Sequence, residues 1–153
     1  METTAVDQFA ELLGVQVLHR SFDEARCQLN VKDEHMNALG GVHGGVIFSL
    51  ADIAFAMACN AGDAPYTGLQ ADIRYMSGAK DKVLFATATK VGSSKKFAHY
   101  EVVITDGLNN RVALFTSTCY RLAPSYVFMG RGDSEQKLFK LIKALNRLVM
   151  FQS

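Results

Sequence analysis

The segment HGGVIFSLADIAFAMACNA, residues 43–61, decides the fold. After its two glycines nearly every position is apolar, which is the pattern of a helix buried on most sides. The next four residues, GDAP, contain the glycine and the proline that end a helix. The sequence therefore predicts one long and largely buried helix from residue 44 to about residue 61.

Short strands are predicted on both sides of this helix. Apolar residues alternate with polar ones, and clusters of Gly, Ser, Asn and Asp separate the segments. A short helix over residues 4–13, ended by Gly14, precedes the first strand. The predicted strands cover residues 15–21, 24–31, 68–76, 82–91, 97–105 and 112–122, with a loop over residues 32–41.

One long apolar helix and an antiparallel sheet make an α+β fold. The simplest packing wraps the curved sheet around the helix, which is the hotdog fold. We expect this domain to cover residues 1–124. Residues 125–153 then form a linker and a C-terminal amphipathic helix, with an apolar stripe opposite its lysines. That helix packs on its own subunit or a neighbour, or it touches a membrane surface or a partner protein.

Composition narrows the function classes. The chain has 153 residues, 49% of them hydrophobic and 20% charged, and a net charge of +1, so no nucleic-acid partner is expected. Three widely spaced cysteines and no CxxC pair indicate neither a disulfide framework nor a metal site. The acidic first fifteen residues do not resemble a signal peptide, and no apolar run is long enough to cross a membrane. We expect a cytoplasmic protein.

Asp52 is the one charged residue between positions 46 and 59. An ionised carboxylate in apolar surroundings costs several kcal/mol, even after relaxation. Such a residue has either a structural partner, such as a strand backbone or Ser49, or a catalytic role. Burial would raise its pKa and make it a stronger base. Asp52 is therefore a candidate nucleophile or general base.

Gly44 and Gly45 begin the same helix. The first N–H groups of a helix have no partner within it, and they lie at the positive end of its dipole. Glycines there either let the helix pack tightly against a strand or leave room for an oxyanion. Gly44 and Asp52 are eight residues apart, about 12 Å along one helix. One helix cannot present both groups to one carbonyl, so two antiparallel helices of a twofold dimer are predicted to share each site.

Other candidates support these two residues. Asn37 can orient a water or hold a loop, and His43 can bond a substrate oxygen or fix the turn before the helix. The remaining histidines, His19, His35 and His99, are expected at the surface or the edge of the core. Lysines near the strand ends are either a solvated rim or contacts for the phosphates of a substrate such as coenzyme A. The residues expected to contact substrate are Gly45, Phe48, Ser49, Gly68 and Tyr75.

The pattern N-x5-HGG-x6-D over residues 37–52 resembles the signature of the hotdog-fold thioesterases of the phenylacetate-degradation (PaaI-type) group. The segment FSLAD-x-AFA-x-ACN over residues 48–60 is especially similar to that group. YMSGA at residues 75–79 and VALF at residues 112–115 resemble two further segments of it. The likeness covers roughly residues 10–122.

The resemblance implies an acyl-CoA thioesterase, often acting on aryl or hydroxyaryl acyl groups, without metal or organic cofactor. It implies that Asp52 is base or nucleophile, that the N–H of Gly44 (Gly45 second) polarises the carbonyl, and that Asn37 and His43 assist. It also implies a dimer or a dimer of dimers. Gly68 departs from the group, which often has Ser or Thr there, and the adjacent Thr67 is predicted to point to the other face of the strand.

Two alternatives remain open from the sequence. The chain could be a non-catalytic module that binds acyl-CoA or an acyl carrier, an interpretation favoured by Gly68 and the extra C-terminal helix. It could also be a hotdog dehydratase or hydratase, but it lacks the Asp-x-Asn-Pro-x-His pattern.

Overall fold

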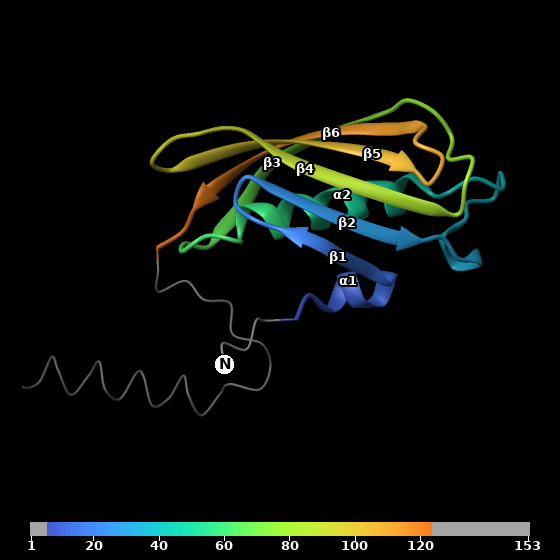
Figure 1. The fold of residues 1–153 in the computed structure, drawn as a ribbon, viewed down its shortest axis with the longest axis horizontal. Coiled ribbons are helices and arrows are strands. Elements are labelled where there is room, and N and C mark those ends of the chain that lie inside the picture. Colours follow the sequence, from blue (N-terminus) through green and yellow to red (C-terminus); the bar gives the residue numbers. More distant parts are fainter. Residues whose placement is uncertain (1–5, 124–153) are drawn as a thin grey trace, which may run out of the picture. The chain divides into compact units, whose positions relative to one another are not determined.

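A computed structural model of the chain describes residues 6–123. The predicted C-terminal helix and the predicted domain boundary at residue 124 lie outside this range. The described part forms one antiparallel sheet of six strands, with the long helix packed against one face (Figure 1). This confirms the predicted α+β hotdog fold.

The six strands follow one another in the sheet in the order β1-β2-β4-β5-β6-β3. Every neighbouring pair is antiparallel. Strands β2, β4, β5 and β6 contain the alternation expected of a sheet with one buried face, as β4 shows with Leu84, Ala86 and Ala88 inside. The strands are β1 (Val15–Arg20), β2 (Glu24–Asn30), β3 (Tyr66–Tyr75), β4 (Val83–Ser93), β5 (Phe97–Asp106) and β6 (Arg111–Arg121).

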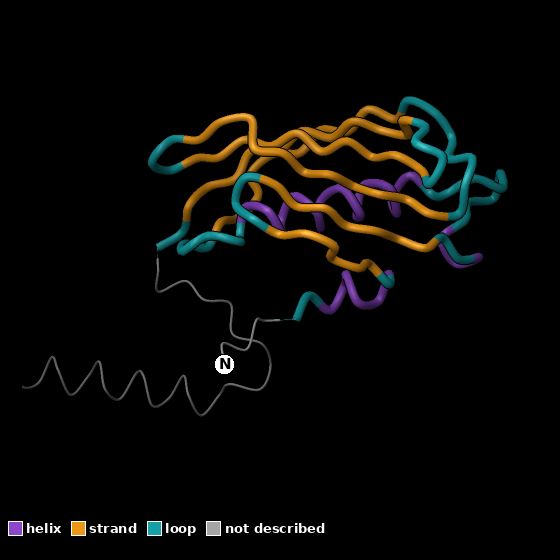
Figure 2. Tube along the Cα trace, viewed as in Figure 1, coloured by secondary structure: helices purple, strands orange, loops and turns teal. Residues whose placement is uncertain are grey.

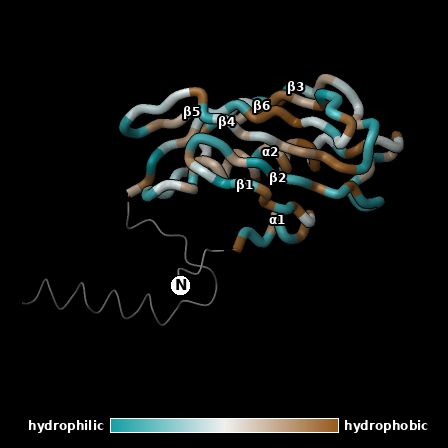
Figure 3. The backbone as a smooth tube through the Cα atoms, viewed as in Figure 1, coloured by the Kyte–Doolittle hydropathy of each residue, from teal (hydrophilic) through white to brown (hydrophobic). Residues whose placement is uncertain are grey.

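Helix α2 (Gly44–Cys59) is the predicted central helix. It packs against all six strands, and its predominantly apolar sequence is visible in Figure 3. Both surfaces at this contact carry small residues, which allow helix and sheet to approach closely. The buried alanines are Ala51, Ala54 and Ala58 on the helix and Ala25, Ala86, Ala88, Ala98 and Ala113 on the sheet.

The N-terminal helix is shorter than predicted. Helix α1 covers Gln8–Leu13, because the Asp7 side chain caps it by accepting hydrogen bonds from the backbone N–H groups of Phe9 and Ala10. Gly14, in the left-handed conformation (φ 79°), ends it. The predicted loop over residues 32–41 contains one turn of 3-10 helix, η1 (Asp33–His35) (Figure 2).

The sheet has two edges, β1 and β3. Strand β3 is ten residues long, and most of its residues are exposed on both faces of the sheet. A long open edge presents unpaired N–H and C=O groups to any strand that can pair with it. This edge lies beside the site described below.

Within residues 6–123, no helix combines the length and the apolar composition needed to cross a membrane.

Candidate active site

The N-terminus of α2 is formed by His43 and the two glycines. His43 caps the helix, and its Nδ1 accepts a hydrogen bond of 2.8 Å from the N–H of Gly45. The N–H of Gly44 has no acceptor among the described residues. Of the two glycines, Gly44 thus presents the free donor at the positive end of α2.

Tyr75 holds this end of the helix from the other side. Its hydroxyl donates a hydrogen bond of 2.9 Å to the carbonyl oxygen of Gly44. A Cβ atom on Gly44 would lie 3.2 Å from that hydroxyl and 3.3 Å from the adjacent ring carbon. Glycine at position 44 therefore allows the close approach of the Tyr75 ring.

Asn37 organises the loop that leads into the helix. Its side-chain oxygen accepts hydrogen bonds from the N–H groups of Leu39 (2.9 Å) and Gly41 (3.1 Å). This is the loop-holding role that the sequence analysis left open, and the Asn37 amide nitrogen donates to none of the described residues. His35 supports the same loop, since its carbonyl accepts the N–H of His43 at 2.8 Å.

His35 itself is not at the surface. Its side chain is 3% exposed, and its Nδ1 accepts the N–H of Lys32 at 3.1 Å. The expectation that it lies at the surface or the core edge was therefore wrong. The other two histidines, His19 and His99, are exposed as expected, and His99 bonds the Thr118 hydroxyl.

Asp52 lies in the middle of α2, and its side chain is exposed in the single chain. The prediction that this carboxylate is buried was wrong for the isolated protomer, because α2 is covered by the sheet on one side only. Solvent reaches the carboxylate from one direction, while the surrounding protein still removes part of its hydration. This partial burial raises its pKa above the usual value, and the negative charge of Asp7 raises it further.

Ser49 is not the partner of Asp52. The Ser49 hydroxyl donates to the carbonyl oxygen of Gly45 at 2.7 Å, a bond to the preceding turn that serine often forms inside a helix. The Asp52 carboxylate accepts no hydrogen bond from any residue between 6 and 123. It is free to bind a water molecule or a substrate.

The Asp52 side chain lines an open cleft of about 440 Å³ between α2 and the edge strand β3. The walls combine apolar and polar groups, which suits an acyl group with a polar reacting end. Besides Asp52, the lining residues are Phe55, Ala56, Cys59, Asn60, Tyr66, Thr67, Gly68, Leu69, Gln70, Ala71 and Ser117.

Gly68 lies on the inner face of β3, where it pairs with buried Cys119, whereas Thr67 pairs with Tyr120 on the other face. This pairing puts Thr67 and Gly68 on opposite faces of the strand, as predicted, but Thr67 also lines the cleft. A Cβ on Gly68 would lie 3.5 Å from the Phe55 ring. Gly68 therefore contributes only backbone to the cleft.

Phe48 is directed elsewhere. Its ring packs edge to face on Phe115 at a centroid distance of 5.4 Å, within the core of the protomer. Of the aromatic residues expected at the site, the structure therefore places only Tyr75 beside Gly44.

Three residues at or near the site escaped the sequence analysis. Asn60 closes the turn after α2 by accepting the N–H of Tyr66 at 2.8 Å, and the Ser117 hydroxyl donates to the carbonyl of Gln70 at 2.7 Å. Asp7 acts on Asp52 by its charge. The position of Asp7 directly before a helical pattern was a usable capping signal, but nothing in the sequence placed α1 near Asp52.

Among residues 6–123, no group of three or more His, Cys, Asp or Glu side chains could hold a metal ion.

Comparison with known proteins identifies the family. Residues 39–113, which include both ends of the proposed site, match the model of the thioesterase superfamily. Acyl-coenzyme A thioesterase PaaI from Escherichia coli is 30% identical over 117 residues, which cover 76% of this chain and 84% of that protein. The chain belongs to the thioesterase superfamily.

Other members of this superfamily have similar sequences and structures. Human acyl-coenzyme A thioesterase 13 is 31% identical over 105 residues, which cover 65% of this chain and 75% of that protein. A mutant of the phenylacetic acid degradation protein PaaI from Thermus thermophilus superposes with a TM-score of 0.72 at 36% identity, covering 76% of this chain and all of that chain. E. coli PaaI superposes with a TM-score of 0.73 at 28% identity, covering 76% of this chain and 86% of that chain.

These findings confirm the predicted family and enzyme class: the chain is a thioester hydrolase of the superfamily that contains the PaaI proteins.

Proposed function

We propose that this thioesterase hydrolyses acyl-CoA to the free acid and coenzyme A. The observation that carries the proposal is the Asp52 carboxylate, which stands without a hydrogen-bond partner among the described residues, in an open cleft on the central helix. The acyl-CoA thioesterases named above support the choice of the CoA thioester.

Two groups carry out the proposed reaction, the Gly44 N–H and the Asp52 carboxylate. The N–H of Gly44 donates to the carbonyl oxygen of the thioester and stabilises the negative charge that develops there. Asp52 either attacks the carbonyl carbon or removes a proton from the attacking water. His43 holds the first turn of α2 through Gly45, and Asn37 holds the loop before it. The reaction proposed here needs no metal or organic cofactor.

The two groups come from different subunits in this proposal. Gly44 and Asp52 lie on one continuous helix, about 12 Å apart along its axis. The Asp52 cleft opens beside the edge strand β3, whose outer flank pairs with no other strand among residues 6–123. A second copy placed at this edge around a twofold axis would bring its Gly44 to the cleft, forming a dimer or a dimer of dimers with paired sites.

The apolar walls of the cleft support an aromatic acyl group as substrate. Phe55, Tyr66 and Leu69 offer apolar surface beside Asp52, and a cleft of about 440 Å³ is of the size that holds small organic ligands. We therefore propose aryl or hydroxyaryl acyl-CoA as the preferred class. The three cysteines are free and buried, which supports a reducing, cytoplasmic setting.

A thiol-release assay on a panel of aryl-acyl and straight-chain acyl-CoAs tests the proposal. The wild-type protein should release coenzyme A from at least one member, and Asp52→Asn should reduce kcat by more than about a thousandfold, since the group that attacks or activates water is lost. Glu11→Gln, a change of the same kind on the exposed face of α1, should leave the rate unchanged. Binding without hydrolysis across the panel would instead favour the non-catalytic acyl-CoA module.

A further inference from the structure

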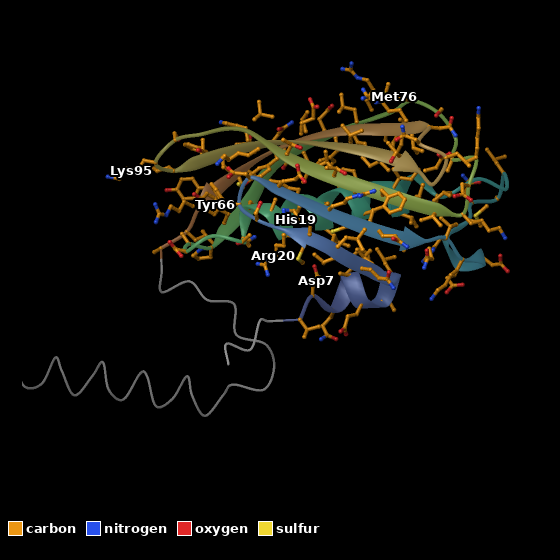
Figure 4. All side chains as sticks on the ribbon, in the orientation of Figure 1. Asp7, His19, Arg20, Tyr66, Met76 and Lys95 are labelled. Atoms are coloured by element: carbon orange, nitrogen blue, oxygen red, sulfur yellow. The ribbon has the colours of Figure 1, made fainter. Side chains whose placement is uncertain are left out.

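Strand β3 carries two opposite charges on one face of the sheet edge. Its pairing with β6 places Ile73 opposite a buried residue, on the inner face, and Asp72 opposite an exposed residue, on the outer face. Arg74, two positions after Asp72, is exposed on the same outer face. No other strand among residues 6–123 pairs with this edge. Figure 4 labels Tyr66 at the start of β3 and Met76 just after its end.

A twofold axis limits how two copies of β3 can pair. In an antiparallel pair of identical strands, one residue lies at the axis opposite its own copy, and the residues on either side of it pair with each other across the axis. Identifying the residue at the axis therefore fixes the whole register.

The charges on the outer face discriminate between the possible registers. An axis at Asp72 or at Arg74 would place two like charges directly opposite one another, which destabilises a strand pair. An axis at Ala71 would pair both charges with uncharged residues. An axis at Ile73 pairs each Asp72 with the partner's Arg74, so one dimer contains two such ion pairs. The outer face therefore favours Ile73 at the axis.

The inner face supports the same register. With the axis at Ile73, Ala71 lies opposite the partner's Tyr75, and the Cα atoms of such a pair are about 4.5–5.5 Å apart. Ala71 lines the cleft that contains Asp52. The Tyr75 hydroxyl binds the carbonyl oxygen of Gly44 at 2.9 Å. This register would therefore place the partner's Tyr75, and with it the partner's Gly44, beside the Asp52 cleft.

We propose that two copies of this chain pair along β3 with Ile73 at the twofold axis, and that reciprocal ion pairs between Asp72 and the partner's Arg74 select this register. The outer-face charges and the inner-face contacts point to the same axis through different residues. Ion pairs on an exposed face contribute little to affinity, and their main effect is to disfavour the other registers. This inference rests on the shared site of the proposed function and adds the residues that align the two subunits.

Charge reversal in the full-length protein tests the ion pairs. Asp72→Arg and Arg74→Asp each replace two ion pairs by two like-charge pairs. The dissociation constant of either variant, measured by analytical ultracentrifugation, should therefore rise about tenfold or more. The double variant Asp72→Arg/Arg74→Asp should associate as wild type does. Glu101→Arg, on the outer face of β5 and separated from the edge by β6, is the matched control and should not change the association.

A mixture of the two single variants separates contacts between subunits from effects within one strand. The Asp72→Arg chain has two positive charges at these positions and the Arg74→Asp chain has two negative charges, so a mixed dimer regains both opposite-charge pairs. An equal mixture should form mixed dimers in preference to either homodimer, and less so as salt is added. Single variants that associate as tightly as wild type, or a mixture without this preference, would overturn the proposed ion pairs.

Cysteine pairs test the register itself. In the proposed dimer, Asp72→Cys in one chain and Arg74→Cys in the other have their Cα atoms within the range that a disulfide spans. On mild oxidation, an equal mixture of these two variants should give more covalent dimer than either variant alone. A covalent dimer formed mainly by Asp72→Cys alone, Arg74→Cys alone or Ala71→Cys alone would move the axis to that residue and overturn the inference. A mixture that gives no covalent dimer would contradict it as well.

These measurements need no substrate, so they separate the inference from the proposed function. If the ion pairs and the register are found but no thioester is hydrolysed, the proposed function fails and the inference stands. If Asp52 and Gly44 act together from different subunits but the mixed charge variants show no preference for one another, this inference alone fails.

Discussion

At the scale of single residues, the most constrained position in the site is Gly44. Its N–H is free, its carbonyl is held by Tyr75, and a Cβ would contact the Tyr75 ring at 3.2–3.3 Å. Its neighbour Gly45 has already given its N–H to His43. Two adjacent glycines that are equivalent in the sequence therefore have different roles in the structure.

Gly44→Ala should reduce kcat by about tenfold or more, since the ring or the first turn of α2 must shift and removal of an oxyanion donor costs about 10²–10³. Adding Tyr75→Ala should restore part of the rate by making room for the methyl group. Gly92→Ala, where a Cβ meets nothing within 4 Å, is the matched control and should be neutral. If the double variant were slower than Gly44→Ala alone, the steric explanation would be wrong.

Ionised Asp52 should lower the stability of the folded state at neutral pH. Its pKa is higher in the folded chain than in the unfolded chain, so the folded state holds the proton more tightly. The free energy of unfolding therefore falls as pH rises from the pKa of Asp52 in the unfolded chain through its pKa in the folded chain. Above this range the ionised side chain destabilises the fold. Asp52→Asn should melt at a higher temperature than wild type at pH 7. The difference in melting temperature should vanish at a pH below the pKa of Asp52 in both the folded and the unfolded chain. Thermal unfolding at several pH values would show this.

At the scale of elements, a single carboxylate, Asp106, holds the turn between β5 and β6. The Asp106 side chain is 1% exposed and accepts hydrogen bonds from the backbone N–H groups of Lys80, Leu108 and Asn110 and from the Asn110 amide. Removal from water raises the pKa of Asp106, but these bonds favour the ionised form and together hold the pKa below its usual value. Asp106 thus ties the segment before β4 to the β5–β6 turn.

Asp106→Ala should lower the melting temperature by several degrees at pH 7, because the donors it leaves behind lose their acceptor. The stabilisation by ionised Asp106 is present above the pKa of the unfolded chain and is lost as pH falls through the lower, folded value. The gap between variant and wild type should therefore narrow on acidification. Asp63→Asn, at an exposed position, should leave the melting temperature unchanged. If it lowered the melting temperature as much as Asp106→Ala does, the bonds at the β5–β6 turn would not explain the effect.

The sequence predicted most of these elements because their patterns are local. The alternation in β4 and the apolar run of α2 are visible in the residues themselves, and the strand ends differ from the prediction by one or two positions. The exposure of Asp52 was not predictable in this way. It depends on where the sheet ends, and the strand beside Asp52 is β3, whose place at the edge follows from pairing with the distant β6.

At the scale of the whole molecule, the proposed shared site depends on the open edge along β3. In the part of the chain that the structure describes, the strand order β1-β2-β4-β5-β6-β3 leaves this ten-residue strand without a paired strand on one side. The order depends on long-range pairing, which the strand patterns do not encode. The distance argument along α2 nevertheless predicted a shared site from the sequence alone.

Subunit mixing tests that sharing. If each site takes Gly44 from one chain and Asp52 from the other, Asp52→Asn and an inactive Gly44 variant should complement one another. Co-refolded in equal amounts, half of the dimers are mixed and one of their two sites is intact, so about a quarter of wild-type activity should return. Each variant refolded alone supplies the baseline. Recovery of no activity by a mixture that forms mixed dimers would mean that both groups act within one chain.

The hydroxyl of Tyr75 joins the last residue of β3 to the first residue of α2. A twist of the β3 edge, such as pairing with another strand would impose, would therefore reach Gly44, whose amide we propose as the donor to the reacting oxygen. In the proposed dimer, the Tyr75 side chain would link the contact between subunits to the rate of catalysis. A change that weakens the association between subunits should therefore lower the rate of hydrolysis even when every reacting group is still present.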